Sequence, residues 1–172
     1  MNRKLGYFGL SVLCILTAVL TLSIGNSPAS GDGIVALANG SGQIHVGTPP
    51  ELRTFTFTAQ TDSSGTSRGQ VEGFNRSGAG RRFHCSVDCL SISGNVATVG
   101  GVVTDISPAT PPFFEPGNFI LFQVIDNGHG QSGTPDEISL TFFFSTGSSN
   151  PGCTGFGTFA NIPVENGNVT VH

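Results

Sequence analysis

The sequence has little positive charge and few aromatic residues other than phenylalanine. Lys4 is its only lysine, tryptophan is absent, and the single tyrosine is Tyr7. After residue 29, five arginines stand against eleven acidic residues, which gives a net charge of −6. We therefore expect no nucleic-acid partner and no membrane contact beyond the N-terminal segment, because residues that neutralise phosphate are missing. The lack of Trp and Tyr also argues against carbohydrate binding on aromatic platforms.

Residues 1–29 have the pattern of an export signal. Positive charge at Arg3 and Lys4 precedes the apolar run Leu5–Ile24, which contains no charged residue. Small residues then surround Pro28, and we predict cleavage after Ala29. Because the apolar run is almost long enough to cross a bilayer, an uncleaved anchor is the alternative.

The remaining chain has the length of one domain, and its hydrophobic pattern is that of strands. We expect a flexible glycine-rich leader over residues 30–42 and an all-β domain over residues 43–172. In Arg53–Gln60, phenylalanine alternates with threonine, as in a half-buried strand. The stretch Arg82–Asp105 predicts a central hairpin that turns at Gly94-Asn95.

Further short strands are expected where apolar residues alternate between turn-rich segments. These are Gln43–Val46, Ser67–Phe74, Asn118–Asp126, Ile138–Ser145, Gly155–Ala160 and Gly167–His172. No segment sustains a helical period. The pattern predicts a single antiparallel β-sandwich or barrel of about eight or nine strands.

Three cysteines follow the signal segment, and export favours a disulfide between two of them. Cys85 and Cys89 would lie about 13 Å apart on one extended strand, at roughly 3.3 Å per residue, which is too far to bridge. We favour a Cys89–Cys153 bridge, with Cys85–Cys153 as the alternative. A local Cys85–Cys89 bridge would need a bulge or a turn.

Two loops carry the candidate binding residues. In the loop from Asp126 to Glu137, the oxygens of Asp126, Asn127 and Asp136 offer a calcium site. The alternative is that Asp126 and Asn127 cap a turn through side-chain bonds to the backbone, and we favour the turn. Phe113 and Phe114 lie on a proline-stiffened loop, where they either form a contact surface or fold back over the core.

No other cofactor is indicated, and the four histidines lack the close spacing of a zinc site. His84 and Asp88 share a strand at a spacing too large for direct contact. An exported enzyme that uses His84 or His129 with Asp88 or Asp126 is therefore the alternative to a non-catalytic domain.

Several short motifs together resemble the β-rich domain of secreted bacterial surface proteins that often accompanies choice-of-anchor domains. They are Gly69–Glu72, Phe83-His84, Cys89–Ala97, Val124–Gly128 with Asp136, and Gly167–Val171. The resemblance implies a compact antiparallel module at the bacterial cell exterior, with no catalytic residues to transfer. We expect a secreted or surface-associated structural or binding module, with an extracellular or cell-surface protein as its partner.

Overall fold

The computed structural model describes residues 33–77, 80–128, 133–145, 148–157 and 159–172. The predicted signal segment and His129 lie outside these residues. The described part belongs to one compact unit and is all β, as the sequence predicts. None of it forms a helix that could span a membrane.

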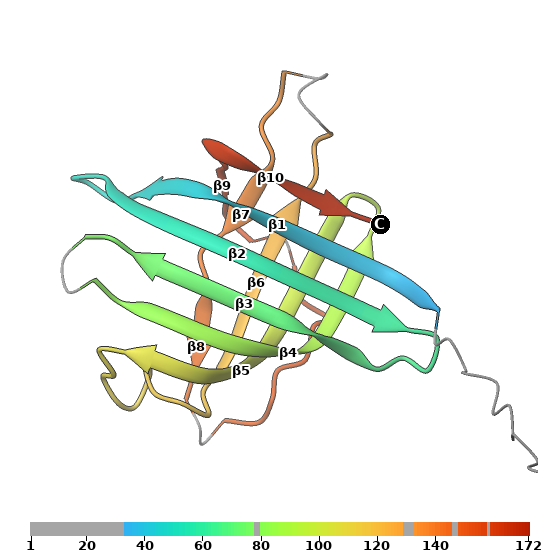
Figure 1. Ribbon diagram of the computed structural model, residues 1–172, viewed down its shortest axis with the longest axis horizontal. Coiled ribbons are helices and arrows are strands. Elements are labelled where there is room, and N and C mark those ends of the chain that lie inside the picture. Colours follow the sequence, from blue (N-terminus) through green and yellow to red (C-terminus); the bar gives the residue numbers. More distant parts are fainter. Residues whose placement is uncertain (1–32, 78–79, 129–132, 146–147, 158) are drawn as a thin grey trace, which may run out of the picture. The chain divides into compact units, whose positions relative to one another are not determined.

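Ten antiparallel strands form a single sheet that curls into a half-barrel (Figure 1). The strands are β1 (Ile34–Val46), β2 (Glu51–Asp62), β3 (Ser67–Asn75), β4 (Arg82–Ser93), β5 (Val96–Ser107), β6 (Phe119–Ile125), β7 (Glu137–Ser139), β8 (Phe142–Phe144), β9 (Asn161–Pro163) and β10 (Asn166–Val171). Their order across the sheet is β10-β1-β2-β3-β4-β5-β6-β7-β9, and β8 pairs with β6. In Figure 1, β1, β2 and β3 run side by side across the view, with β6 and β7 steeply inclined to them.

The core fills the inside of the curled sheet. It consists of alternate residues of the long strands, as expected for a sheet with one buried face. Phe57 and Phe122 meet edge to face at its centre, with ring centroids 5.4 Å apart. Other buried members are Ala38, Ala59, Val71, Cys85, Val99, Val103, Ile120, Val124 and Val169.

The expectation of a flexible leader is wrong for residues 34–42, because these residues form the first nine positions of β1. The strand lies between β2 and β10, so both of its edges are hydrogen-bonded. Gly40 is needed there because a Cβ atom would lie 2.9 Å from the Phe57 ring and 2.9 Å from the Asn168 carbonyl oxygen. The glycines that suggested a linker instead make room for core side chains.

The predicted hairpin is present as β4 and β5, with Gly94 at a φ of 61° in the turn. Two of the expected strands differ from the structure, whereas the expected strand 167–172 is present as β10. The stretch 138–145 is divided into β7 and β8, which lie along different parts of β6, and residues 155–157 and 159–160 are not strand. The last two strands are β9, which pairs with β7, and β10, which pairs with β1 at the other end of the strand order.

Candidate functional site

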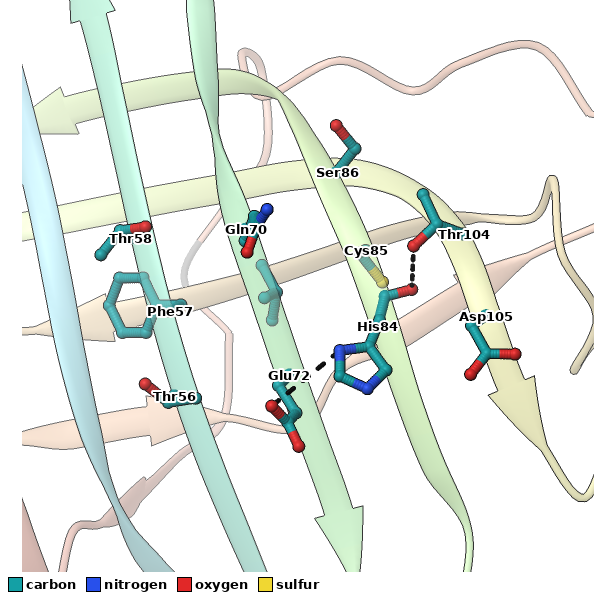
Figure 2. Close-up of a pocket in the computed structure, with 11 residues that line it drawn as sticks. Thr56, Phe57, Thr58, Gln70, Glu72, His84, Cys85, Ser86, Thr104 and Asp105 are labelled. Atoms are coloured by element: carbon teal, nitrogen blue, oxygen red, sulfur yellow. Dashed lines mark hydrogen bonds and ion pairs between the residues drawn. The ribbon is translucent and has the colours of Figure 1, made fainter.

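One face of the half-barrel, over β1 to β4, is open to solvent and carries mostly uncharged polar side chains. These side chains alternate with the buried core residues of the same strands. Cross-strand pairing aligns them in two rows (Figure 2). One row is Asn39, Thr58, Gln70 and Ser86, and the other is Ser41, Thr56, Glu72, His84 and Asp105. We call this surface the polar face.

Two adjoining open grooves, of about 660 and 720 Å³, cross the polar face. Thr56, Thr58 and Gln70 line both grooves, so the hollow is continuous across the strands. Hydroxyl and amide groups both donate and accept hydrogen bonds. The polar face can therefore bind a polar partner mainly by hydrogen bonding, with the carboxylates of Glu72 and Asp105 in its second row.

Among the described residues, His84 is the only histidine that lines these grooves, and its contacts are weak. Its Nδ1 lies 3.9 Å from Glu72 Oε2, whereas Glu72 Oε1 lies 2.8 Å from a nitrogen of Arg82. The hydroxyl of Thr104 donates to the backbone carbonyl of His84, not to its ring. A general base is normally positioned by hydrogen bonds of about 2.6–3.2 Å. The Glu72–His84 distance is longer than this range.

Of the pairings that the catalytic alternative offers, His84 with Asp88 is not among the contacts of the described residues. Asp88 instead accepts a 2.7 Å hydrogen bond from Asn150. A bulge in the β4–β5 ladder at Asp88 shifts the strand register there, between Val87 and Cys89. Among the described residues, no three His, Cys, Asp or Glu side chains are grouped to hold a metal ion.

The same bulge accounts for the disulfide. Cys85 and Val87 point into the core, and the extra residue places Cys89 on the opposite face, where it bonds to Cys153 with 5.7 Å between the Cα atoms. This is the pairing that the sequence favours. The bridge lies over Gly100, where a Cβ would come within 2.6 Å of the Cys89 sulfur. It ties the segment after β8 onto β4 and β5, and such a bridge is typical of an oxidising, extracellular environment.

The predicted calcium loop has a different arrangement from a metal site. Asp136 is buried, and its two oxygens accept hydrogen bonds from the backbone N–H groups of Asn127 and Val169. Asp126 accepts from the N–H groups of Gly128 and Val171. Both carboxylates therefore bind the backbone, Asp126 within its own turn as in the turn alternative, and both also reach β10.

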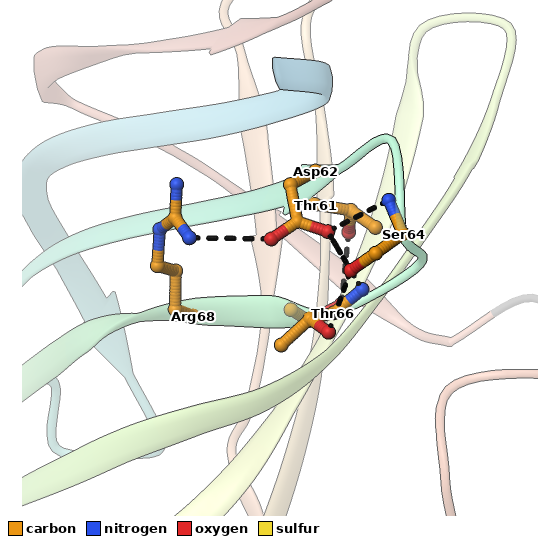
Figure 3. A network of polar contacts seen from close by, with 6 residues as sticks. Thr61, Asp62, Ser64, Thr66 and Arg68 are labelled. Carbon is orange, nitrogen blue, oxygen red and sulfur yellow. Dashed lines mark hydrogen bonds and ion pairs between the residues drawn. The ribbon is translucent and has the colours of Figure 1, made fainter. Parts of the chain in front are cut away.

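The turn between β2 and β3 holds a second buried carboxylate (Figure 3). Asp62 accepts from the backbone N–H groups of Ser64 and Thr66 and from the Ser64 hydroxyl, and Arg68 lies 3.2 Å away. The hydrogen bond from the Ser64 side chain is the main cause that lowers the pKa of Asp62, and burial opposes it. The two backbone hydrogen bonds and the charge of Arg68 lower the pKa further. The contacts are those of a turn stabilised by its own side chains.

This turn also contains a Gly-x-Ser-x-Gly pattern, Gly65–Gly69, which resembles the nucleophile elbow of hydrolases. The elbow requires a turn from a strand into a helix, but here the turn joins two strands of a hairpin. The hydroxyl of Ser67 lies 2.8 Å from the hydroxyl of Thr61. The pattern is therefore part of a hairpin turn.

The two phenylalanines of the predicted contact loop differ in their packing. Phe113 is 56% exposed, whereas Phe114 folds back so that its ring lies 5.0 Å from that of Phe143. The guanidinium of Arg81 covers the other side of Phe114, 4.0 Å from its centroid. Phe114 thus lines a pocket at one end of the half-barrel, and Phe113 remains available for contact.

Comparison with known proteins does not assign the chain to a family: no family model, curated protein or solved structure matches it.

Proposed function

We propose that this chain is a non-catalytic, secreted or surface-associated β-domain that acts as a structural or binding module of the bacterial cell exterior. The resemblance of its short motifs to the β-rich domains that accompany choice-of-anchor domains supports the proposal. The observation that carries the proposal is the polar face, a continuous hollow lined by hydroxyl and amide groups on strands that the disulfide-tied segment leaves uncovered.

The partner we propose is another protein of the cell surface or the extracellular space. Such a partner would contact the polar face through hydrogen bonds, and the exposed ring of Phe113 is available for a separate apolar contact. Strand positions fix the polar side chains, so little conformational entropy is lost when a partner binds.

Two measurements test this function. Immobilised purified protein should recover a surface or extracellular protein from cells that express the chain. A screen of hydrolytic substrates should find no turnover. If turnover is found and His84→Ala abolishes it while the fold is retained, the exported-enzyme alternative replaces the proposal.

The substrate screen should include His45→Ala as a matched control. His45 is an exposed histidine bonded to Glu165 and lies outside both grooves. Turnover that both variants retain calls for His129→Ala as well, and only turnover that survives all three substitutions would point to a contaminating enzyme and leave the binding proposal in place.

A further inference from the structure

A second pocket, of about 210 Å³, lies at one end of the half-barrel and is separate from the polar grooves. It opens between the start of β2, the end of β3 and the start of β4 on one side. The proline-rich loop after β5 and the strand β8 complete its rim. Mouths of β-barrels are frequent positions for small-molecule sites. We call it the mouth pocket.

The walls of the mouth pocket are aromatic. The ring of Phe143 meets that of Phe83 at 5.3 Å and that of Phe114 at 5.0 Å, both close to edge to face. Gly73 forms part of the wall because a Cβ there would lie 2.4 Å from the Phe83 ring. An aromatic guest would find the edge-to-face partners that such rings prefer.

The pocket also contains two of the few cationic groups of the chain, Arg53 and Arg81. Nε of Arg53 is buried, and within the described residues it has no hydrogen-bond acceptor. The Nη2 of the same side chain is 3.4 Å from Glu51, so that carboxylate accounts for only one part of the guanidinium. An unpaired buried N–H of an arginine is costly and is best satisfied by an anionic oxygen.

Positive charge is concentrated around this end. Of the five arginines after residue 33, Arg53 and Arg81 line the pocket and Arg76 lies over the ring of Phe74, another wall residue. The domain as a whole is acidic, so this pocket is an exception to its charge pattern. The charge favours a small anion over a cation or a polyanion.

From this combination we propose that the mouth pocket binds a small aromatic carboxylate. The ring would lie among the phenylalanines and the carboxylate would accept hydrogen bonds from Arg53. A cavity of about 150 Å³ lined by apolar side chains is large enough for benzene, so the mouth pocket has room for one ring and a carboxylate. The inference is independent of any partner on the polar face.

Titration of the purified full-length protein with benzoate, benzyl alcohol and acetate tests the proposal, with the Phe ring resonances followed by NMR. Benzoate should bind at least tenfold more tightly than either of the others and should shift the ring signals of Phe83, Phe114 and Phe143. Equal binding of benzoate and benzyl alcohol, or no binding of benzoate, would overturn the proposal.

Arg53→Met keeps the length of the side chain and removes its donors. We expect it to lose the tenfold preference for benzoate while it still binds benzyl alcohol, which also shows that the pocket has folded. The matched control is Arg68→Met, at the far end of β3 and outside the mouth pocket, which should keep the preference. If both variants behave like the wild-type protein, Arg53 does not hold the carboxylate and the proposal fails.

Discussion

Asp136 accepts a 2.7 Å hydrogen bond from the backbone N–H of Val169, 33 residues further along the chain. Val169 lies opposite Gly40 on β1. In an antiparallel ladder, hydrogen-bonded and non-hydrogen-bonded pairs alternate, and this pair is of the second kind, so the N–H of Val169 points away from β1. The N–H of Val171 points the same way and donates to Asp126. Two carboxylates thus take the place of a neighbouring strand on the free edge of β10. They connect that edge to the β6–β7 connection.

Removing the Asp136 carboxylate should therefore destabilise the whole domain. We expect Asp136→Ala to lower the free energy of unfolding by about 3 kcal/mol, because two backbone N–H groups lose a charged acceptor. Asp136→Asn should cost roughly half as much, since one oxygen remains. Urea unfolding followed by circular dichroism measures both.

Asp105→Ala is the control, because it removes an exposed carboxylate and should change stability by less than about 0.5 kcal/mol. A melting temperature that rises on addition of calcium, with the rise lost in Asp126→Ala, would contradict the assignment of these carboxylates to the backbone.

The disulfide should contribute to stability and also hold the segment after β8 against β4 and β5. Replacing Cys89 and Cys153 together with serine should lower the free energy of unfolding by about 4 kcal/mol for a bridge with a sequence separation of 64. Limited proteolysis should then cut first between β8 and β9. Equal protease resistance with and without the bridge would show that the segment is held by other contacts.

Cys85 should be unreactive in the folded protein. Its side chain is buried in the core, and this burial strongly raises the pKa of the thiol. In the protein cleaved after Ala29, which lacks Cys14, a thiol reagent should find no reactive group under native conditions and one after denaturation. Rapid labelling of the native protein would mean that the β4 core face is exposed in solution.

The pH dependence of stability should show the contribution of Asp62. Its pKa is lowered on folding, so it stabilises the protein fully above the unfolded-state pKa of about 3.9. The contribution is lost as the pH falls through the lower folded-state pKa. The stability difference between the wild-type protein and Asp62→Asn should therefore be constant near neutral pH and shrink in this acidic range. A stability difference between the two proteins that persists unchanged at the lowest pH would contradict this role of Asp62.

The strands and their direction could be predicted from the sequence, because phenylalanine and threonine alternate in β2 and a Gly-Asn step joins β4 to β5. The start of β1 could not be predicted in the same way. Its glycines lie under the rings of Phe55 and Phe57, which are remote in sequence, and locally they are indistinguishable from those of a linker.

The candidate site was less predictable than the fold. Register decides which polar residues share a face, and the bulges at Thr104 and Asp88 each shift the register by one residue. The roles of Asp126 and Asp136 depend on a strand more than thirty residues away. His84 and Asp105 face each other only because of pairing that no local pattern specifies.

The central claim is that the polar face is the binding surface of a non-catalytic module. Its direct test is the binding of purified protein to intact cells that express the chain, with wild type, Thr58→Glu/Gln70→Glu and the exposed-turn control Ser93→Glu compared at equal concentrations. We expect at least a tenfold loss of binding for the double variant and wild-type binding for Ser93→Glu. Equal binding by all three proteins would contradict it.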